Sequence, residues 1–288
     1  MDCFNRPLLV RPKPIKGERM KKGKTGLVVL ALTALTALAL MAPVAQGATP
    51  KPGYEQFRGC PTTAEVPVVV GCARAVIKGG HFQMGTKDVP LTNPMTLTGG
   101  FDEFGNVYAN AEGGLTPVKQ KVPGGVVGLT GLTWLLELLG SEALTLYAIT
   151  EIAGQPNIGA TTKLPIKVHL VNSVLGNNCY VGSFTSPIKL DLTTGTTSPP
   201  LPNKPITGVP SEFAFDFEKE IITQNNGTWV DNSFAAPGAS GCVLTLFGFI
   251  PISINGLVNS QSGLPSPAGK NETKQIQDIQ TTGVINVY

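Results

Sequence analysis

The chain has 288 residues, of which 42% are hydrophobic and 14% are charged, and its formal net charge is +3. This hydrophobic content excludes an intrinsically disordered chain. The first 47 residues contain eight of the 22 basic and two of the 19 acidic residues, so 14 basic and 17 acidic residues remain, a net charge of −3. Because the remainder has no basic surplus, we expect no nucleic acid as a partner.

The first 47 residues have the composition of a secretory signal peptide. Three lysines within residues 21–24 precede an apolar run over residues 27–42, and small residues follow as far as Gly47. The run of about 16 residues is shorter than the ~20 that a membrane-spanning helix needs, so cleavage after Gly47 is favoured over an uncleaved anchor. We expect a leader, residues 1–47, and a secreted part, residues 48–288, with one β-rich domain or two β subdomains. Its expected location is extracellular, free or associated with the cell wall.

Four cysteines remain after the leader: Cys60, Cys72, Cys179 and Cys242. In an oxidising compartment an even number of cysteines favours disulfides. Of the three possible pairings we predict Cys60–Cys72, which closes a short loop, and Cys179–Cys242. A zinc site is disfavoured because no pair has the C-x-x-C spacing, and we expect neither a metal nor a cofactor.

Glycine and proline are frequent, with 34 and 24 residues, and they separate short runs in which apolar and polar residues alternate. This pattern is typical of an all-β sandwich or barrel. We therefore predict an all-β, β-sandwich-like fold with short strands, long Pro/Gly-rich loops and at most one or two short helices. The first internal turn is predicted at Gly79-Gly80, between the runs ARAVIK and HFQMG.

The segment Val126–Ile152 is the most unusual part of the secreted chain. Its front half is almost continuously Leu, Val and Trp, with leucines at helical spacing from Leu129 to Leu139, and Gly140 ends the predicted helix. Its rear half alternates like a strand. Such a segment could enter a bilayer after a rearrangement, but an apolar run of about 14 residues is more often a buried helix.

Two phrases with nearly the same letters follow, PIKVHL at residues 165–170 and PIKLDL at residues 187–192. Each alternates with a period of two and starts with proline, which is tolerated where a strand begins. The phrase does not recur further along the chain, as a tandem repeat would. We therefore predict two neighbouring antiparallel strands rather than a duplicated binding motif.

Further along, Phe213, Phe215 and Phe217 alternate with polar or small residues and predict another strand. Asn225-Asn226-Gly227 then separates two extended runs and predicts a type I′ hairpin, because Asn-Gly accepts the positive φ angles of that turn. Residues 271–279 are ambiguous, and a short helix capped by Asn271-Glu272 is one interpretation.

Catalytic motifs are weak in this sequence. His81 and His169 are its only histidines, and we interpret both as solvated side chains rather than a metal pair or an acid–base pair. Ser240 lies in GASGC, which differs from the G-x-S-x-G elbow by a cysteine in place of the last glycine. Ser186 and Lys189 match S-x-x-K, but Pro187 and the predicted strand separate their side chains. We predict no catalytic residue.

Acidic residues form two clusters. Asp216, Glu218 and Glu220 alternate along one predicted strand face, and Asp102-Glu103 lies in a Gly-flanked turn with Asn106. Such clusters can hold Ca²⁺ or serve a glycosidase as acid and nucleophile. Neither has the ligand spacing of a calcium loop, so we prefer the interpretation of solvated charges.

The chain resembles a group of uncharacterised secreted proteins of actinobacteria over most of its secreted length. The resemblance rests on long phrases that occur in order: FRGCP, VPLTNPMTLTGG, LPIKVHLVNSVLGNNCYVGS, PIKLDLTTGTTSPPLPNKPITG, VDNSFAAPGASGC and GLPSPAGKN. It implies an exported, disulfide-containing protein and brings no established activity, ligand or active site.

These features favour a secreted, non-catalytic protein that acts at or outside the cell envelope by binding a surface or by a structural role. The expected partner is a cell-wall glycan or a surface protein, recognised by the Pro/Gly/Thr-rich loops 193–205 and 258–269. A membrane-associated or pore-forming protein that uses Val126–Ile152 is the alternative. A carbohydrate-active hydrolase that uses the acidic clusters is a second alternative.

Overall fold

Alternating runs of the sequence form β-strands along most of the chain. The computed structural model describes residues 48–246 and 250–288, and it is 43% strand and 13% helix. The prediction of an all-β, sandwich-like fold is therefore confirmed. The predicted signal peptide, residues 1–47, lies outside the described residues.

The larger sheet has eight strands in the order β12-β13-β17-β1-β3-β4, with β2 paired to β1 and β5 to β3. All of these pairings are antiparallel. The strands are β1 (Gly71–Met84), β2 (Lys87–Pro90), β3 (Met95–Phe101), β4 (Val107–Tyr108), β5 (Gly114–Leu115), β12 (Glu212–Asp216), β13 (Ile221–Asp231) and β17 (Glu272–Gly283).

The second sheet has seven strands in the order β14-β10-β9-β7-β6, with β8 and β11 also paired to β9. A separate two-stranded ribbon is formed by β15 (Val243–Leu246) and β16 (Ile250–Ser253). The strands of the second sheet are β6 (Lys119–Lys121), β7 (Tyr147–Ile152), β8 (Asn157–Ile158), β9 (Thr162–Val171), β10 (Tyr180–Val181), β11 (Ile188–Leu192) and β14 (Ala239–Ser240).

Short helices connect the strands: a 3₁₀-helix η1 (Glu55–Phe57), α1 (Gly125–Thr130), α2 (Trp134–Ala143), α3 (Asn255–Ser262) and α4 (Val284–Val287). The leucine-rich stretch predicted as one helix is divided into α1 and α2. Gly131 ends α1 in the left-handed conformation, with φ of 74°, which an L side chain rarely adopts. None of the helices in the described parts of the chain is long and apolar enough to cross a membrane.

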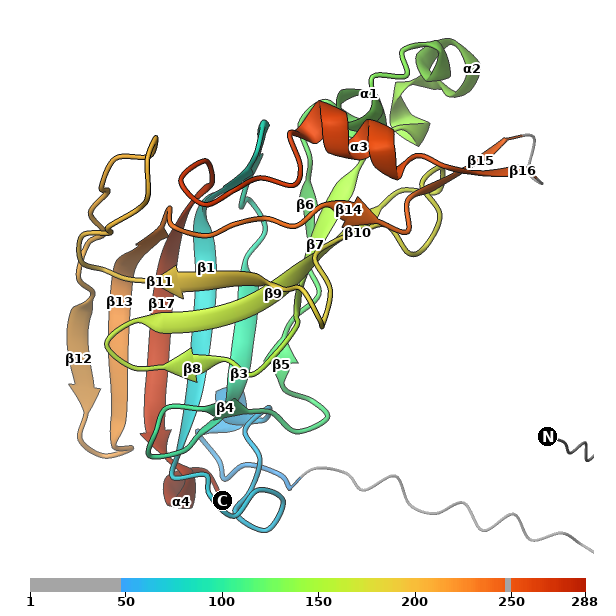
Figure 1. Cartoon of the computed structure of the whole chain (residues 1–288). Helices are drawn as coiled ribbons and strands as arrows, with labels where there is room; N and C mark the ends of the chain where they lie inside the picture. Colours follow the sequence, from blue (N-terminus) through green and yellow to red (C-terminus); the bar gives the residue numbers. More distant parts are fainter. Residues whose placement is uncertain (1–47, 247–249) are drawn as a thin grey trace, which may run out of the picture. The chain divides into compact units, whose positions relative to one another are not determined.

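The two sheets face each other, and β8, β9 and β11 run across the strands of the larger sheet (Figure 1). Isolated bridges join the sheets at Asn106–Asn157 and at Thr193–Val230. The main hydrophobic core lies between the sheets, and it includes the buried residues of β9 and β11. The architecture therefore places the inner faces of both sheets around one common interior.

The two similar phrases are neighbouring antiparallel strands, as predicted. Ile166 of β9 lies opposite Ile188 of β11. The apolar residue of every second position in each phrase is buried, and the lysines between them are less so. Strand pairing therefore explains the likeness of the phrases.

Both predicted disulfides are present. Cys60–Cys72 joins the segment after η1 to β1, and Cys179–Cys242 joins the segment before β10 to the segment before β15. All four cysteines are fully buried. The first bridge belongs to a small second core near α4, whereas the second belongs to the main core.

Two turns predicted from the sequence are wrong, because the chain passes through them as bulged strands. The register of β1 against β17 shifts between Ile77 and Gly79, and that of β13 against β17 shifts between Gln224 and Gly227. Gly80 has φ of 118°, and a side chain there would collide with the carbonyl group of Lys274. Residues that accept positive φ serve a bulge as readily as a turn.

The two bulges meet across β17. The Lys78 ammonium lies 2.8 Å from the Asp278 carboxylate and donates a hydrogen bond of 2.7 Å to the Asn226 side-chain oxygen. The Asn226 amide in turn donates to Asp278 at 2.8 Å. Burial acts to raise the pKa of Asp278, but the hydrogen bonds from Asn226 and Lys78 outweigh it, so the pKa is below its ordinary value.

The helix considered for residues 271–279 is also wrong, because this segment is the central strand β17. Gln275 and Gln277 point into the protein, whereas Ile276 between them is exposed. The pattern is inverted relative to an ordinary half-buried strand, which has its apolar side chains inside. Because of this inversion the sequence pattern does not indicate a strand here, and polar groups are brought into the interior.

Candidate functional site

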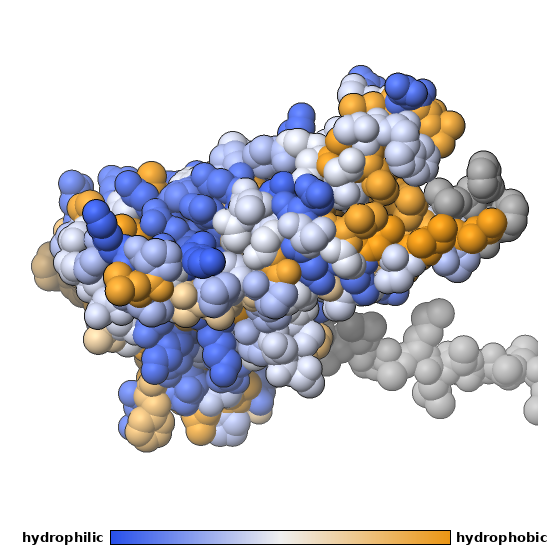
Figure 2. All heavy atoms as spheres, turned by 45° about the horizontal axis from the view of Figure 1, so that its top comes forward, coloured by the Kyte–Doolittle hydropathy of each residue, from blue (hydrophilic) through white to orange (hydrophobic). Residues whose placement is uncertain are grey.

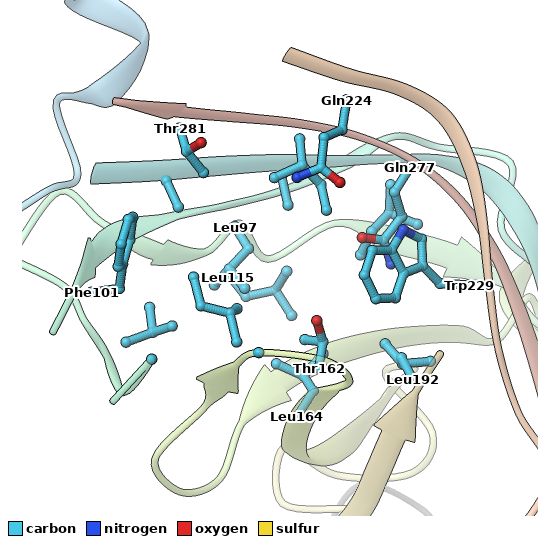
Figure 3. Close-up of a pocket in the computed structure, with 18 of the residues that line it drawn as sticks. Leu97, Phe101, Leu115, Thr162, Leu164, Leu192, Gln224, Trp229, Gln277 and Thr281 are labelled. Atoms are coloured by element: carbon cyan, nitrogen blue, oxygen red, sulfur yellow. The ribbon is translucent and has the colours of Figure 1, made fainter. Parts of the chain in front are cut away.

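A cavity of about 490 Å³ lies between the inner faces of the two sheets (Figure 3). Its volume is within the roughly 300–1,000 Å³ of typical small-molecule sites. Most of its wall is apolar, and the apolar side chains come from both sheets: Ile77, Leu97, Phe101, Val107, Leu115, Leu164, Leu192 and Ile279. The cavity is therefore suited to the apolar body of a ligand.

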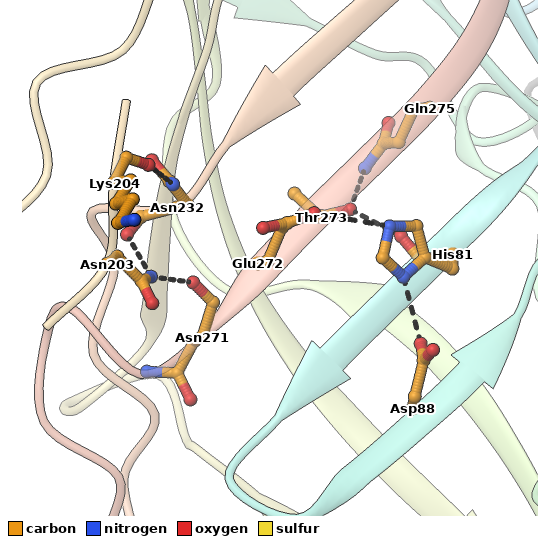
Figure 4. A network of polar contacts seen from close by, with 9 residues as sticks. All are labelled: His81, Asp88, Asn203, Lys204, Asn232, Asn271, Glu272, Thr273 and Gln275. Atoms are coloured by element: carbon orange, nitrogen blue, oxygen red, sulfur yellow. Dashed lines mark hydrogen bonds and ion pairs between the residues drawn. The ribbon is translucent and has the colours of Figure 1, made fainter. Parts of the chain in front are cut away.

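The larger sheet adds polar groups to this wall through β17. The Gln277 amide nitrogen donates to the Gln275 side-chain oxygen at 2.7 Å, and the Gln275 amide nitrogen lies 3.5 Å from the Thr273 hydroxyl oxygen. Thr273 in turn donates to the carbonyl oxygen of His81 at 3.0 Å (Figure 4). The hydrogen bond from Gln277 occupies the side-chain oxygen of Gln275. Among the described residues, the side-chain oxygen of Gln277 accepts no hydrogen bond.

Trp229 of β13 lies at the same end of the cavity as Gln277 (Figure 3). The residue is 9% exposed, and its indole Nε1 is buried without a hydrogen-bond partner in the described part of the chain. Gly227 beside it leaves no room for a side chain, because a Cβ atom there would collide with the Ser211 hydroxyl oxygen and lie 3.0 Å from that nitrogen. This nitrogen lies on the side of Gly227 and Ser211, which do not line the cavity, so Trp229 contributes apolar ring surface to the wall rather than its N–H group.

One end of the cavity reaches the surface at the loop after β3. Glu103 and Phe104 line the cavity and are exposed, and Phe104 has 74% of its surface accessible. Gly159, after β8, lines the same opening from the second sheet. The opening is thus bordered by a single charged side chain that is free to face the solvent, Glu103.

Asp102 holds this loop in place. Its carboxylate accepts hydrogen bonds from the Phe104 amide at 2.9 Å, from the Asn106 amide and side chain at 2.9 Å each, and from the Tyr108 hydroxyl at 3.1 Å. Burial acts to raise the pKa of Asp102, but the hydrogen bonds from Asn106, Tyr108 and Phe104 outweigh it and lower the pKa. The prediction that Asp102 and Glu103 are both solvated charges is therefore correct only for Glu103. Asp102 is 6% exposed and shapes the cavity opening.

At the opposite edge, Asp231 ends β13 and is 1% exposed. It accepts hydrogen bonds from the amides of Asp191 and Ser233, both at 2.8 Å, and so ties β11 to β13 beside the Thr193–Val230 bridge. Burial is the main influence on this carboxylate and raises its pKa. The two edges of the interior are therefore each held by a buried aspartate, with opposite pKa shifts.

The two histidines lie on different sheets, His81 on β1 and His169 on β9. His81 is within β1 rather than after a turn, where its Nδ1 lies 3.0 Å from Asp88 and its Nε2 3.6 Å from Glu272 (Figure 4). Nearby, Asn271 is fully buried, and its side chain bonds the backbone at Gly85 and Phe234. The cluster ties the start of β17 to β1 and β2.

His169 lies on the outer face of β9. Its ring stacks on Tyr180 with centroids 4.3 Å apart, and Nε2 lies 3.0 Å from the carbonyl oxygen of Asn177. Its other nitrogen is 3.5 Å from Glu151, which also pairs with Lys167 at 2.9 Å. The structure therefore gives the two histidines separate charged partners and does not bring them together.

The acidic strand face predicted at Asp216, Glu218 and Glu220 is not formed. β12 ends at Asp216, whose carboxylate accepts hydrogen bonds from the amides of Glu218 and Lys219 in the turn that follows. The phenylalanines of β12 are exposed on this edge strand. Ser240 lies on the short strand β14 and Lys189 is in the exposed part of β11, so neither weak motif acquires its geometry.

Within residues 48–246 and 250–288, no three His, Cys, Asp or Glu side chains gather as a metal-binding group. No protein-family model, no curated protein and no solved structure matches the chain. The site described here is therefore built from the geometry alone. Sequence reasoning missed Trp229, Gln275 and Gln277, and the signal that could have found them was the pair of glutamines at alternate positions of a strand-length segment.

Proposed function

We propose that this protein is a secreted, non-catalytic binding protein that holds an uncharged amphipathic molecule between its two sheets. The single observation that carries the proposal is the apolar cavity with the inward side-chain amides of Gln275 and Gln277 on its wall. Polar residues at core positions cost stability unless they are paired. Their presence on the wall of a cavity is most simply explained by a ligand that completes their hydrogen bonds.

The chemistry of the wall narrows the ligand class. The Gln277 amide nitrogen is used by Gln275, and the side-chain oxygen of Gln277 can accept a hydrogen bond from a ligand hydroxyl group. The only charged residues on the wall are Asp102, which is engaged in its own loop, and Glu103 at the opening. Among the described residues, those that line the cavity include no lysine or arginine that could pair with an anionic ligand. A long-chain alcohol or a monoacylglycerol has the required apolar body and neutral polar group.

Secretion and the absence of catalysis are parts of the same proposal. The two buried disulfides support an oxidising compartment, as the leader does. Among the acidic residues considered for a hydrolase, Asp216 serves its own turn and Asp102 its own loop. A wall glycan or surface protein, the partner expected from the sequence, would bind the exposed loops rather than this cavity.

The tryptophan content allows a direct test. The chain has two tryptophans, and the variant Trp134→Phe leaves Trp229 in the cavity as the only one. Titration with a long-chain alcohol or a monoacylglycerol should change the emission of Trp229 and saturate at one ligand per protein. The corresponding fatty acid should bind more weakly above pH 6, where it is ionised.

Two further measurements make the test decisive. Native mass spectrometry of protein collected from the producing cells should show a copurified neutral molecule that is lost after extraction with organic solvent. The variant Gln277→Met keeps an unbranched side chain of similar length but removes the amide, so it should weaken binding of the alcohol more than of an alkane of equal length. Equal affinity for alcohol, acid and alkane, or no saturable binding of any of them, would show that the proposal is wrong.

A further inference from the structure

Helix α2 is more apolar than its packing requires. Of its ten residues only Leu135 is buried. The exposed apolar side chains share the half of the helix before Gly140, where the backbone leaves helical geometry: Trp134 at 44%, Leu136 at 43%, Leu138 at 66% and Leu139 at 42%. A surface helix of a globular protein normally turns its apolar stripe to the core, and here most of the stripe faces away from it.

The β15–β16 ribbon has the same property. All four residues of β16 are exposed, and Ile250 and Ile252, at 41% and 42%, lie on one face of the strand. The ribbon forms its own two-stranded sheet and pairs with neither large sheet. Two-stranded ribbons are marginally stable without a hydrophobic partner surface, so this exposed apolar strand is also unusual.

The two segments come to the same end of the molecule. Helix α1, which precedes α2, packs on α3, which follows β16, and in Figures 1 and 2 α2 and the ribbon project together beyond the second sheet. Figure 2 shows hydrophobic side chains gathered over both. We call the exposed apolar residues of α2 and β16 the apolar tip.

The base of the tip is firmly held, so its exposure does not reflect a missing core. Val126 of α1 and Val258 of α3 are fully buried, and Leu135 of α2 is 1% exposed. The disulfide Cys179–Cys242 fixes the chain just before β15 to the second sheet. The fold thus presents these apolar side chains on an anchored support.

Charge around the tip indicates what covers it. Residues 232–269, which include β15, β16 and α3, contain no Asp, Glu, Lys or Arg at all, and the only charged residues of α2 are Glu137 and Glu142. A patch that meets another protein is usually surrounded by a polar, charged rim. A lipid layer instead requires that charge be absent from the part that enters it, and tryptophan prefers the boundary between head groups and chains.

We propose that the apolar tip docks on the surface of a lipid layer, with α2 and β16 entering the boundary between head groups and acyl chains. The sequence already directed attention to Val126–Ile152, but β7 at its rear is paired on both sides within the second sheet. In the structure, the second part of the exposed apolar surface is β16 instead, which lies more than 90 residues further along the chain. The proposal does not depend on a ligand in the cavity.

The acidic residues of α2 make the proposal specific for lipid charge. Glu137 and Glu142 are both exposed, and no lysine or arginine lies on α2, β15, β16 or α3. An anionic surface repels these carboxylates, whereas a zwitterionic surface does not. The tip therefore prefers electrically neutral or zwitterionic lipids.

Vesicles of phosphatidylcholine provide the test. In the variant Trp229→Phe, Trp134 on the tip is the only tryptophan, and its emission should shift to shorter wavelength when the vesicles are added. The wild-type chain should sediment with the same vesicles. Replacing one third of the lipid with phosphatidylserine should weaken binding.

A matched pair of variants locates the contact. Leu138→Asp combined with Ile252→Asp should lower vesicle binding at least about tenfold, because charge replaces apolar surface at both halves of the tip. The control Ile285→Asp alters a side chain that is 78% exposed on α4, outside the tip, and should bind as the wild type does. Circular dichroism and thermal unfolding check that all variants are folded.

Several outcomes would overturn the proposal. They are the absence of any emission shift and of sedimentation, binding to phosphatidylserine vesicles alone, or an equal loss of binding in the Ile285→Asp control. A concentration-dependent dimer that is abolished by the tip variant, with no binding to vesicles, would instead assign the tip to a second copy of the chain.

Discussion

The molecule has two apolar surfaces of opposite exposure, the wall of the inter-sheet cavity and the apolar tip, and each contains one of the two tryptophans. In the cavity, apolar side chains from two sheets enclose a few polar groups, and Trp229 is 9% exposed. On the tip, apolar side chains from one helix and one strand face outward, and Trp134 is 44% exposed. The wall residues Ile77, Leu164 and Leu192 belong to the main hydrophobic core, whereas the exposed side chains of the tip remain accessible to water.

The difference in exposure distinguishes apolar side chains that stabilise the fold from those that remain available for binding. Apolar side chains that are removed from water stabilise the folded state by about 25 cal/mol per Å². Those of the tip contribute little of this stabilisation, because they remain accessible. The wall residues contribute to folding and at the same time shape a space for a ligand. Substitutions in the two regions should therefore have clearly different effects on the free energy of unfolding.

The largest expected effect is the loss of the disulfide Cys179–Cys242, which joins the chain before β10 to the chain before β15. Replacing Cys179 and Cys242 by alanine opens a link with a sequence separation of 63, and loop-closure entropy predicts a loss of unfolding free energy of about 4 kcal/mol as an upper value. The same change at Cys60 and Cys72, with a separation of 12, should cost about 3 kcal/mol. Urea denaturation of each variant measures both losses. A larger loss at the shorter bridge would contradict this order.

The second effect compares a leucine of each region. Leu164→Ala removes a side chain that is 5% exposed on the cavity wall, and it should lower the unfolding free energy by about 2–4 kcal/mol. Leu138→Ala on the tip should change it by no more than about 0.5 kcal/mol. Denaturation in urea gives both values under the same conditions. If the two losses are similar, the tip is packed more tightly in solution than its exposure indicates.

The third effect concerns ligand capacity. Ala75 of β1 lines the cavity opposite the second sheet, and Ala75→Leu should reduce ligand affinity about tenfold by occupying the space of the ligand body, since tenfold corresponds to 1.4 kcal/mol. The control Ala214→Leu lies on the exposed strand β12. Fluorescence titration in the Trp134→Phe background measures both. Unchanged affinity in Ala75→Leu would place the ligand outside the cavity.

The smallest effect is a difference in pH dependence between the two edges of the interior. Asp102 has a lowered pKa in the folded state, so its stabilising contribution is present above the unfolded pKa of about 3.9 and is lost as the pH falls through the folded pKa. Asp231 has a raised pKa, so its ionised form opposes folding at neutral pH, and the fold gains from its protonation as the pH falls toward 4.

Urea denaturation between pH 3 and pH 7 measures this contrast in two variants. Asp102→Asn should flatten the loss of stability at the acid end. In Asp231→Asn the stability difference from the wild type should become more favourable to the variant as the pH rises above 4. Parallel pH profiles for the wild type and both variants would mean that neither carboxylate has the predicted pKa shift.

The sequence by itself determined the features that depend on local pattern and on pairs of like residues. The all-β class follows from alternation and from glycine and proline between short runs, and the disulfide Cys60–Cys72 follows from a short loop. The pairing of β9 with β11 follows from two matching amphipathic phrases. In each case the information lies within the few residues concerned, because side-chain alternation and short-loop closure are local properties.

Only the tertiary structure decided the rest, because it depends on neighbours far along the chain. Gly80 and Asn226 adopt positive φ, which either a turn or a bulge can use, and the presence of β17 between β1 and β13 selects the bulges. The inward glutamines of β17 contradict the usual alternation of a half-buried strand. Their position is explained only by the opposing sheet, which encloses a cavity on that face. The tip joins α2 to a strand that is distant in sequence. Period and propensity report which side chains share a face, whereas the opposing surface determines whether that face meets core, cavity or solvent.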